Sequence, residues 1–202
     1  MTKYLIVISL FFASSFQVSA QKLVGKFPVS SKTFQIYSGM PPQCDAPTKA
    51  AATTWNGANV RFTLSSAGMS MYNPSLNDAT NSQINIGARP MPNPSYAALA
   101  DYSVTAYSNN LYTFSDVDII VNENYLFYDN RFYCGISMPP SHQLDYQTMM
   151  LHEMGHVYGI DDYGVPYDSR MVMWGAGPGW GNIRRVLTQI DIDNATTLYG
   201  RR

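Results

Sequence analysis

Charged side chains are scarce in this chain of 202 residues. They make up 13% of it, and the formal net charge is −1. There is no excess of basic side chains to hold the phosphates of a nucleic acid or an anionic membrane surface. After Leu5 to Phe12, no apolar run approaches the roughly 20 residues that span a bilayer. The composition therefore argues against a nucleic-acid partner and against stable membrane insertion.

Glutamate, histidine and cysteine are rarer still. The chain has two glutamates, Glu123 and Glu153, three histidines and two cysteines. Two of the histidines and one glutamate fall within the five residues from 152 to 156. In a chain so poor in these residue types, chance is a weak explanation of that clustering.

The first 20 residues have the pattern of a secretory signal peptide. Lys3 supplies a positive start, Leu5 to Phe12 an apolar centre, and Val18-Ser19-Ala20 small residues before a cut at Gln21. An uncleaved anchor is the alternative. We expect residues 21–202 to form one secreted domain, extracellular or periplasmic, that is monomeric.

The clustered residues read H-E-x-x-H-x-x-G-x-x-D, from His152 to Asp162. Residues four apart on a helix share a face, so His152 and His156 can both reach one zinc ion. Glu153 lies beside them and can accept a proton from a water that zinc makes more acidic. Gly159 permits a turn that returns Asp162 to the metal as a third ligand. Asp161, next to it, is the alternative ligand.

The remaining pattern predicts an α+β domain. We expect helices at 45–56, at 145–158 with Asp145 as N-cap, and near the C-terminus, where Thr188 and Asp191 can form a capping box. Strands are expected at 33–38, 60–64, 102–107 and 117–121, with a turn at Ser108-Asn109-Asn110. Residues 65–96 read as a long loop containing a short strand at 84–86. An edge strand is expected within 125–136, and a loop at 163–183.

With these segments in place, the chain resembles the metzincin metalloproteases, and among them the matrixin-like enzymes. The similarity is carried by residues 48–62, 115–122, 144–159, 172–174 and 187–200. An aspartate as third zinc ligand resembles the ligand set of the snapalysin-like enzymes. The resemblance implies a zincin fold, in which a twisted mixed β-sheet is combined with an active-site helix and a C-terminal helix.

The resemblance also implies roles for individual residues. His152, His156 and Asp162 would hold one catalytic zinc ion, and Glu153 would be the general base. Met173 would form the apolar floor beneath the metal, with Met171 as its rival. His142 is expected at the surface. Structural calcium ions remain open, because aspartates and backbone carbonyls are plentiful.

Cys44 and Cys134 are expected to form a disulfide, as a cysteine pair in an exported protein most simply does. The rival is that Cys44, within Pro41-Pro42-Gln43-Cys44-Asp45, blocks the zinc as a thiolate. Little chain precedes the first expected strand, which leaves little room for a separate pro-domain.

Together these features predict a secreted zinc endopeptidase that cleaves proteins or peptides. The substrate would lie extended beside an edge strand, and residues 164–180 would wall the pocket that follows the cleaved bond. Two other functions stay open: a zincin-fold binding module with weak or no catalysis, and a zinc hydrolase of a non-peptide bond.

Overall fold

The computed structural model describes residues 23–77, 81–91, 93–163, 170–175 and 183–202. The expected signal peptide, and most of the loops at 163–183, therefore lie outside the described residues. The three α-helices are α1 (Asp45–Asn56), α2 (Tyr146–Val157) and α3 (Gln189–Tyr199). A 3₁₀ turn at Pro42–Cys44 leads into α1, and a π-helical turn occupies Asn124–Tyr128. None of the helices in the described part of the chain is long and apolar enough to cross a bilayer.

The main sheet has six strands: β1 (Gly25–Lys26), β2 (Ser31–Tyr37), β3 (Thr63–Ser70), β4 (Ile84–Arg89), β5 (Ala98–Ser108) and β6 (Leu111–Asn122). The order is β1-β6-β4-β2-β3, and every neighbouring pair along it is parallel. β5 pairs antiparallel with β6. A second sheet joins β7 (Phe132–Tyr133) to β8 (Leu144–Asp145). The protein is thus a mixed α/β structure with a mostly parallel sheet.

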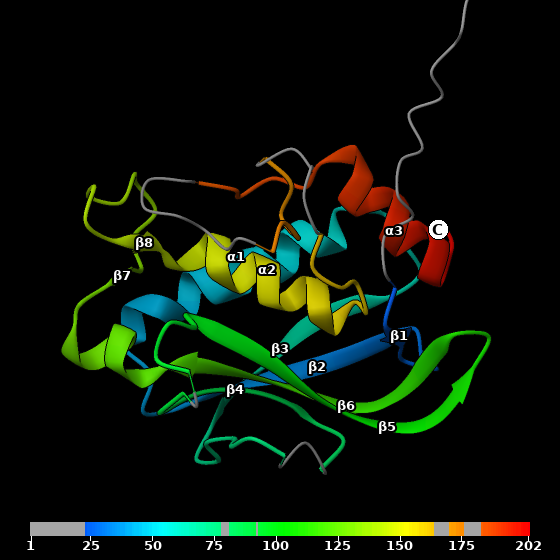
Figure 1. Ribbon diagram of the computed structural model, residues 1–202, viewed down its shortest axis with the longest axis horizontal. Helices are drawn as coiled ribbons and strands as arrows, with labels where there is room; N and C mark the ends of the chain where they lie inside the picture. The colour runs from blue at the N-terminus through cyan, green and yellow to red at the C-terminus, as the bar shows by residue number, and fades with distance from the viewer. Residues whose placement is uncertain (1–22, 78–80, 92, 164–169, 176–182) are drawn as a thin grey trace, which may run out of the picture.

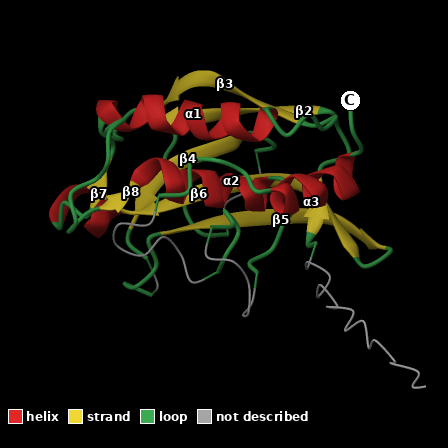
Figure 2. Cartoon of the chain, turned by 90° about the horizontal axis from the view of Figure 1, so that it is seen from above, coloured by secondary structure: helices red, strands yellow, loops and turns green. Residues whose placement is uncertain are grey.

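The helices lie on one side of the sheet, and the core fills the space between them (Figure 1). Trp55 of α1 is fully buried and donates a hydrogen bond from Nε1 to the carbonyl of Leu151 in α2, at 2.8 Å. Its ring stacks on that of Tyr158, 4.9 Å away between centroids. These contacts tie α1 to α2, and the two helices lie side by side (Figure 2).

The structure confirms most of the expected elements whose ends are marked in the sequence by capping or turn residues. α1 has the predicted bounds, and Asp145 caps α2 by accepting from the backbone N–H of Thr148. Thr188 and Asp191 form the predicted capping box. Asn109 and Asn110 both have positive φ, as a tight hairpin turn requires. The disulfide between Cys44 and Cys134 is also confirmed, so Cys44 is not a free thiolate.

Several strands differ from the prediction: β6 begins at Leu111 rather than at 117, β4 continues to Arg89 rather than ending at 86, and β1 was not expected. The strand expected at 60–64 runs from Thr63 to Ser70 instead. Val60 forms only an isolated bridge with Arg201, and the backbone N–H of Arg61 bonds to Gly200, so this segment pairs with the C-terminus. β5 begins at Ala98, earlier than expected, because pairing with β6 overrides the weak strand preference of its alanines.

Candidate metal centre

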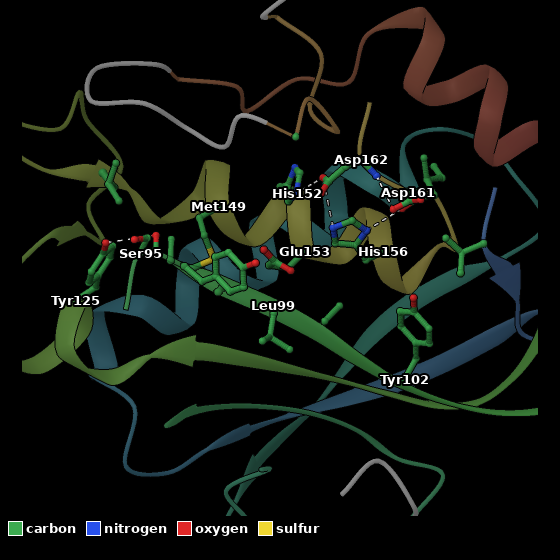
Figure 3. A pocket seen from close by; sticks show the side chains of 18 of the residues that line it. Ser95, Leu99, Tyr102, Tyr125, Met149, His152, Glu153, His156, Asp161 and Asp162 are labelled. Atoms are coloured by element: carbon green, nitrogen blue, oxygen red, sulfur yellow. Dashed lines mark hydrogen bonds and ion pairs between the residues drawn. The ribbon is translucent and has the colours of Figure 1, made fainter. Parts of the chain in front are cut away.

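Three ligand atoms meet beside α2. Nε2 of His152 lies 3.0 Å from Oδ1 of Asp162, and Nε2 of His156 lies 3.7 Å from the same oxygen. Ligand atoms of the three residues all lie within 4.8 Å of one another. Figure 3 shows the two imidazoles turned toward the Asp162 carboxylate. This group can hold a metal ion.

Gly159 brings Asp162 back to the helix. Its φ is 84°, and a Cβ at this position would lie 1.8 Å from the carbonyl oxygen of Gly25. Only glycine fits both the backbone conformation and the close approach. The chain therefore reverses here, and Val24 donates to the Gly159 carbonyl at 2.9 Å.

Backbone carbonyls hold both imidazoles. Nδ1 of His152 lies 2.8 Å from the carbonyl oxygen of Val172, and Nδ1 of His156 lies 2.8 Å from that of Ile160. A carbonyl only accepts, so each Nδ1 carries the proton and donates. In the neutral ring the lone pair is then on Nε2, which faces the ligand cluster. The arrangement presents the Nε2 atoms of both histidines to a cluster that could hold a metal ion.

Asp191 supports this arrangement from α3, a role that sequence reasoning missed. Its Oδ2 accepts from the backbone N–H of Val172 at 3.3 Å, and its Oδ1 accepts from Tyr163 Oη at 3.1 Å. Asp191 thus fixes the peptide whose carbonyl orients His152. The capping box marked Asp191 as structural, but nothing local in the sequence indicates its contact with Val172.

Glu153 is buried beside the cluster, with 5% of its surface exposed. Its Oε2 has no hydrogen-bond partner among the described residues. Burial raises the pKa of Glu153, although the two neighbouring histidines act to lower it. A carboxylate in this position is suited to exchange a proton with a molecule bound in the cleft.

The ligand cluster is electrostatically coupled. Burial acts to lower the pKa of His152, but the Asp162 carboxylate, which accepts a hydrogen bond from the protonated ring, and the charge of Glu153 outweigh it, so the pKa is raised. Burial acts to raise the pKa of Asp162, but its hydrogen bond to His152 outweighs this, so the pKa is lowered. The carboxylate of Asp162 and the two imidazoles thus stabilise positive charge at the point where they meet.

Met173 packs directly against α2, the helix that contains His152 and His156. It is fully buried, and a Cβ added at Gly155 of α2 would lie 2.0 Å from its Sδ. Met171 is also buried, but its carbonyl accepts from Nη1 of Arg184. Among the described residues 170–175, Met173 is therefore the methionine whose sulfur lies against Gly155.

The cluster opens into a cleft of about 680 Å³. One wall is α2, with Met149, His152, Glu153 and His156. The opposite wall includes Ala98, Leu99 and Ala100 at the start of β5. Since β5 pairs only with β6 in the described sheet, its outer edge faces this cleft with unpaired backbone groups.

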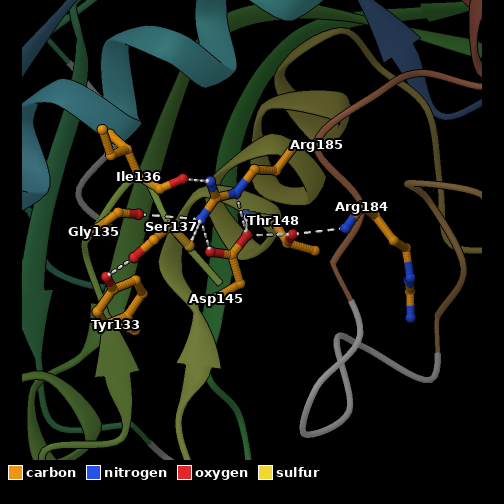
Figure 4. A network of polar contacts seen from close by, with 8 residues as sticks. All are labelled: Tyr133, Gly135, Ile136, Ser137, Asp145, Thr148, Arg184 and Arg185. Carbon is orange, nitrogen blue, oxygen red and sulfur yellow. Dashed lines mark hydrogen bonds and ion pairs between the residues drawn. The ribbon is translucent and has the colours of Figure 1, made fainter. Parts of the chain in front are cut away.

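A polar network anchors the N-terminus of α2 (Figure 4). Oδ2 of Asp145 accepts from Thr148, from N–H at 3.0 Å and from Oγ1 at 2.6 Å, and from Nε of Arg185 at 2.9 Å. Arg185 also donates to the carbonyls of Gly135, Ile136 and Ser137. The guanidinium thus joins the helix cap to the segment that follows Cys134.

The other candidate ligands lie apart from the cluster. His142 is exposed, as expected. Oδ1 of Asp161 accepts from the backbone N–H of Asp162 at 2.9 Å, and Asp161 is not one of the three clustered ligands. Most of the expected pocket wall at 164–180 lies outside the described residues.

Comparison with known proteins adds no assignment: no family model matches the chain, and no curated protein matches it. The interpretation of the site therefore rests on its residues and their geometry.

Proposed function

We propose that the protein is a secreted zinc endopeptidase of the matrixin-like metzincin type. The observation that carries this proposal is that two features lie side by side. A cluster of two imidazoles and one carboxylate lies beside the unpaired carboxylate oxygen of Glu153. Both open into a cleft bordered by the free edge of β5.

The donor set suits zinc. His152 and His156 each offer an Nε2, and Asp162 offers an oxygen, which is the nitrogen and oxygen set of catalytic zinc sites with three protein ligands. When bound, zinc would polarise the carbonyl of the cleaved bond and make a water molecule more acidic.

Glu153 would perform the proton transfers. Its buried Oε2 would take a proton from the attacking water and deliver it to the nitrogen of the leaving amine. Burial raises the pKa of Glu153, which favours the protonated form that the second step needs. Asp162 would serve only as a ligand, because an aspartate carboxyl group is ionised at neutral pH.

The edge of β5 would bind the peptide. An extended segment placed along Ala98–Ala100 can form main-chain hydrogen bonds with the unpaired backbone groups. Such bonds do not depend on side chains, which favours a peptide over a small ester or amide. The disulfide fits an oxidising compartment and so supports secretion.

The mixed sheet, the helix that carries the two histidines and the C-terminal helix agree with what the resemblance implies. The packing of Met173 under α2 supports the same assignment. Calcium sites stay a prediction, because the described residues supply no second group of three metal-binding side chains.

The test compares the purified protein with Glu153→Gln. Both should bind about one zinc ion, measured by atomic emission, and only the parent should cleave casein or unstructured peptides. Glu123→Gln is the matched control, since Glu123 is the other glutamate of the chain and does not line the cleft. It should keep both zinc and activity.

A second pair of variants tests the metal ligands. His152→Ala should lose zinc and activity, whereas His142→Ala, which alters the exposed histidine, should keep both. Zinc in the parent without cleavage of any peptide would contradict a peptidase and favour a binding module. Cleavage that survives Glu153→Gln would refute the role of Glu153.

A further inference from the structure

Arg131 stands out in the cleft because of its charge. Apart from the two histidines, it is the only basic side chain among the described residues that line the cleft. The acidic groups of the lining are Glu153, Asp161 and Asp162, which belong to the metal centre or adjoin it. The cleft is therefore acidic around the metal centre and carries one cation elsewhere.

Tyr125 holds the guanidinium of Arg131. The Cζ of Arg131 lies 4.3 Å from the centroid of the Tyr125 ring, a cation–π arrangement. The backbone is fixed as well, because Arg131 donates its N–H to the Tyr125 carbonyl at 2.9 Å and its carbonyl accepts from Leu144 at 2.6 Å. The side chain is thus presented from a rigid support.

The donors of this guanidinium are only partly used. Nε lies 3.0 Å from Oδ2 of Asp129, in a pair whose side chains are 40% and 43% exposed. Exposed pairs of this kind are weak. Within the described residues, no acceptor takes the Nη donors of Arg131. These donors can form the paired hydrogen bonds that carboxylates accept.

Figure 3 shows where the Tyr125 end of the cleft lies relative to Glu153. Tyr125 and Ser95 lie at one end, Tyr102 lies toward the other, and Met149 lies between Tyr125 and Glu153. Met149 is one helical turn from Glu153, about 6 Å along α2. At ~3.3 Å per residue, an extended peptide passes Met149 roughly two residues from the reacting bond, and the Tyr125 end lies beyond Met149.

The direction of the peptide follows from the strand beside it. β5 runs from Ala98 toward Tyr102, and so away from the Tyr125 end. A peptide added to an edge pairs slightly better when antiparallel. Its C-terminal part then lies toward Tyr125 and Arg131, on the side of the leaving amine.

We propose that Arg131, supported by Tyr125, binds a substrate carboxylate on the leaving-amine side of the cleaved bond. The carboxylate can belong to an aspartate or glutamate side chain, or to the C-terminus of a short peptide. This assignment rests on the proposed peptidase function and gives it a substrate preference.

The test uses peptides matched in all but one charge. A peptide that the protein cleaves is made with glutamate or glutamine at each of the three positions after the cleaved bond, with an amidated C-terminus. A second pair carries a free or an amidated C-terminus two residues after the bond. The first pair reports a side-chain carboxylate and the second a terminal one. We expect kcat/KM to favour the carboxylate form of one pair by about tenfold.

Variants then assign the preference to Arg131. In Arg131→Gln the ratio between the two forms should fall close to one, and in Arg131→Lys part of it should remain, because lysine keeps the charge but not the planar fork. Lys49→Gln is the control, since it removes a cation from α1 that does not line the cleft. It should keep the full ratio.

Binding gives a readout that does not require cleavage. The zinc-loaded Glu153→Ala variant is titrated with the same peptide pairs by calorimetry, with and without Arg131→Gln. No preference for the carboxylate form in either experiment would overturn the inference while leaving the peptidase function intact. A preference that persists in Arg131→Gln would place the carboxylate on another group. If no peptide is cleaved, the proposed function fails, and the calorimetric ratio still decides the role of Arg131.

Discussion

At the scale of single residues, position along the chain decides between chemically identical groups. Asp161 and Asp162 are neighbours, yet only the carboxylate of Asp162 meets the two imidazoles. The turn at Gly159 determines which of the two returns to α2. Spacing favoured Asp162 but left Asp161 as an alternative, because spacing alone does not fix the path of a chain after its helix ends.

The two aspartates can be separated by substitution. Asp162→Ala should weaken zinc binding by more than the roughly 10–100-fold that loss of an outer-shell partner typically costs. Asp161→Ala should stay within a few-fold of the parent, because the carboxylate of Asp161 is not one of the three clustered ligands. Competition with a chromogenic chelator measures both. Equal losses would mean that the two carboxylates share the metal.

Asp118 of β6 gives a prediction for pH dependence. It is fully buried, its Oδ1 accepts from the backbone N–H of Asn85 at 2.7 Å, and its Oδ2 has no partner among the described residues. Burial raises its pKa to about 7, and the charges of Asp116 and Asp101 add to this. Lys32 acts on Asp116 in the opposite direction.

A folded-state pKa above the unfolded value of about 3.9 means that the folded protein binds this proton more tightly. The resulting stability is complete below pH ~4 and is lost as the pH rises through about 7. Asp118→Asn should therefore gain stability relative to the parent as the pH rises from about 4 to about 7, measured by urea unfolding. A difference between Asp118→Asn and the parent that does not change with pH would refute the shift.

At the scale of elements, the segments that were predicted correctly are those whose ends are marked by residues close in the sequence. Asp145 and Thr188 mark helix starts, and Asn109-Asn110 marks a hairpin turn, through contacts within a few residues. The early start of β5 and the late start of β3 depend on partners far along the chain, which a local pattern does not contain. The same holds for the site. Spacing brings together His152, Glu153 and His156, but the contact of Asp191 with Val172 arises only from folding.

The fit between α2 and the segment containing Met173 is the element contact most sensitive to volume. Gly155 lies in the helix, where alanine is intrinsically better by about 1 kcal/mol. A Cβ there would nevertheless meet Met173 Sδ at 2.0 Å and Trp55 Cζ2 at 2.9 Å. Gly155→Ala should therefore destabilise the protein by about 1–3 kcal/mol, as overpacking does.

A double-mutant cycle can assign this cost. Met173→Ala alone should cost about 2–5 kcal/mol through the cavity it leaves. Combined with Gly155→Ala, the loss should be smaller than the sum, because the new methyl group occupies space that the sulfur vacates. Urea unfolding of the four proteins measures the coupling. Additive losses would show that Trp55, rather than Met173, limits the space at Gly155.

At the scale of the whole molecule, the Cys44–Cys134 disulfide and the Arg185 network both fix the segment around Cys134. The disulfide fixes the start of α1 to Cys134, just before the carbonyls that Arg185 binds. Arg185 in turn holds Asp145, the N-cap of α2. The segment around Cys134 thus lies between α1 and the N-terminus of α2, and its order affects both.

Removing the disulfide should lower stability without removing the metal site. Its loop spans 90 residues, for which the chain-entropy model gives roughly 4–5 kcal/mol, with smaller values common in practice. Cys44→Ala/Cys134→Ala should lower the urea midpoint accordingly. Zinc stoichiometry should stay near one under native conditions, because His152, His156 and Asp162 lie outside the closed loop. Loss of zinc from a fully folded variant would show instead that the position of the segment around Cys134 affects α2 through the Arg185 network.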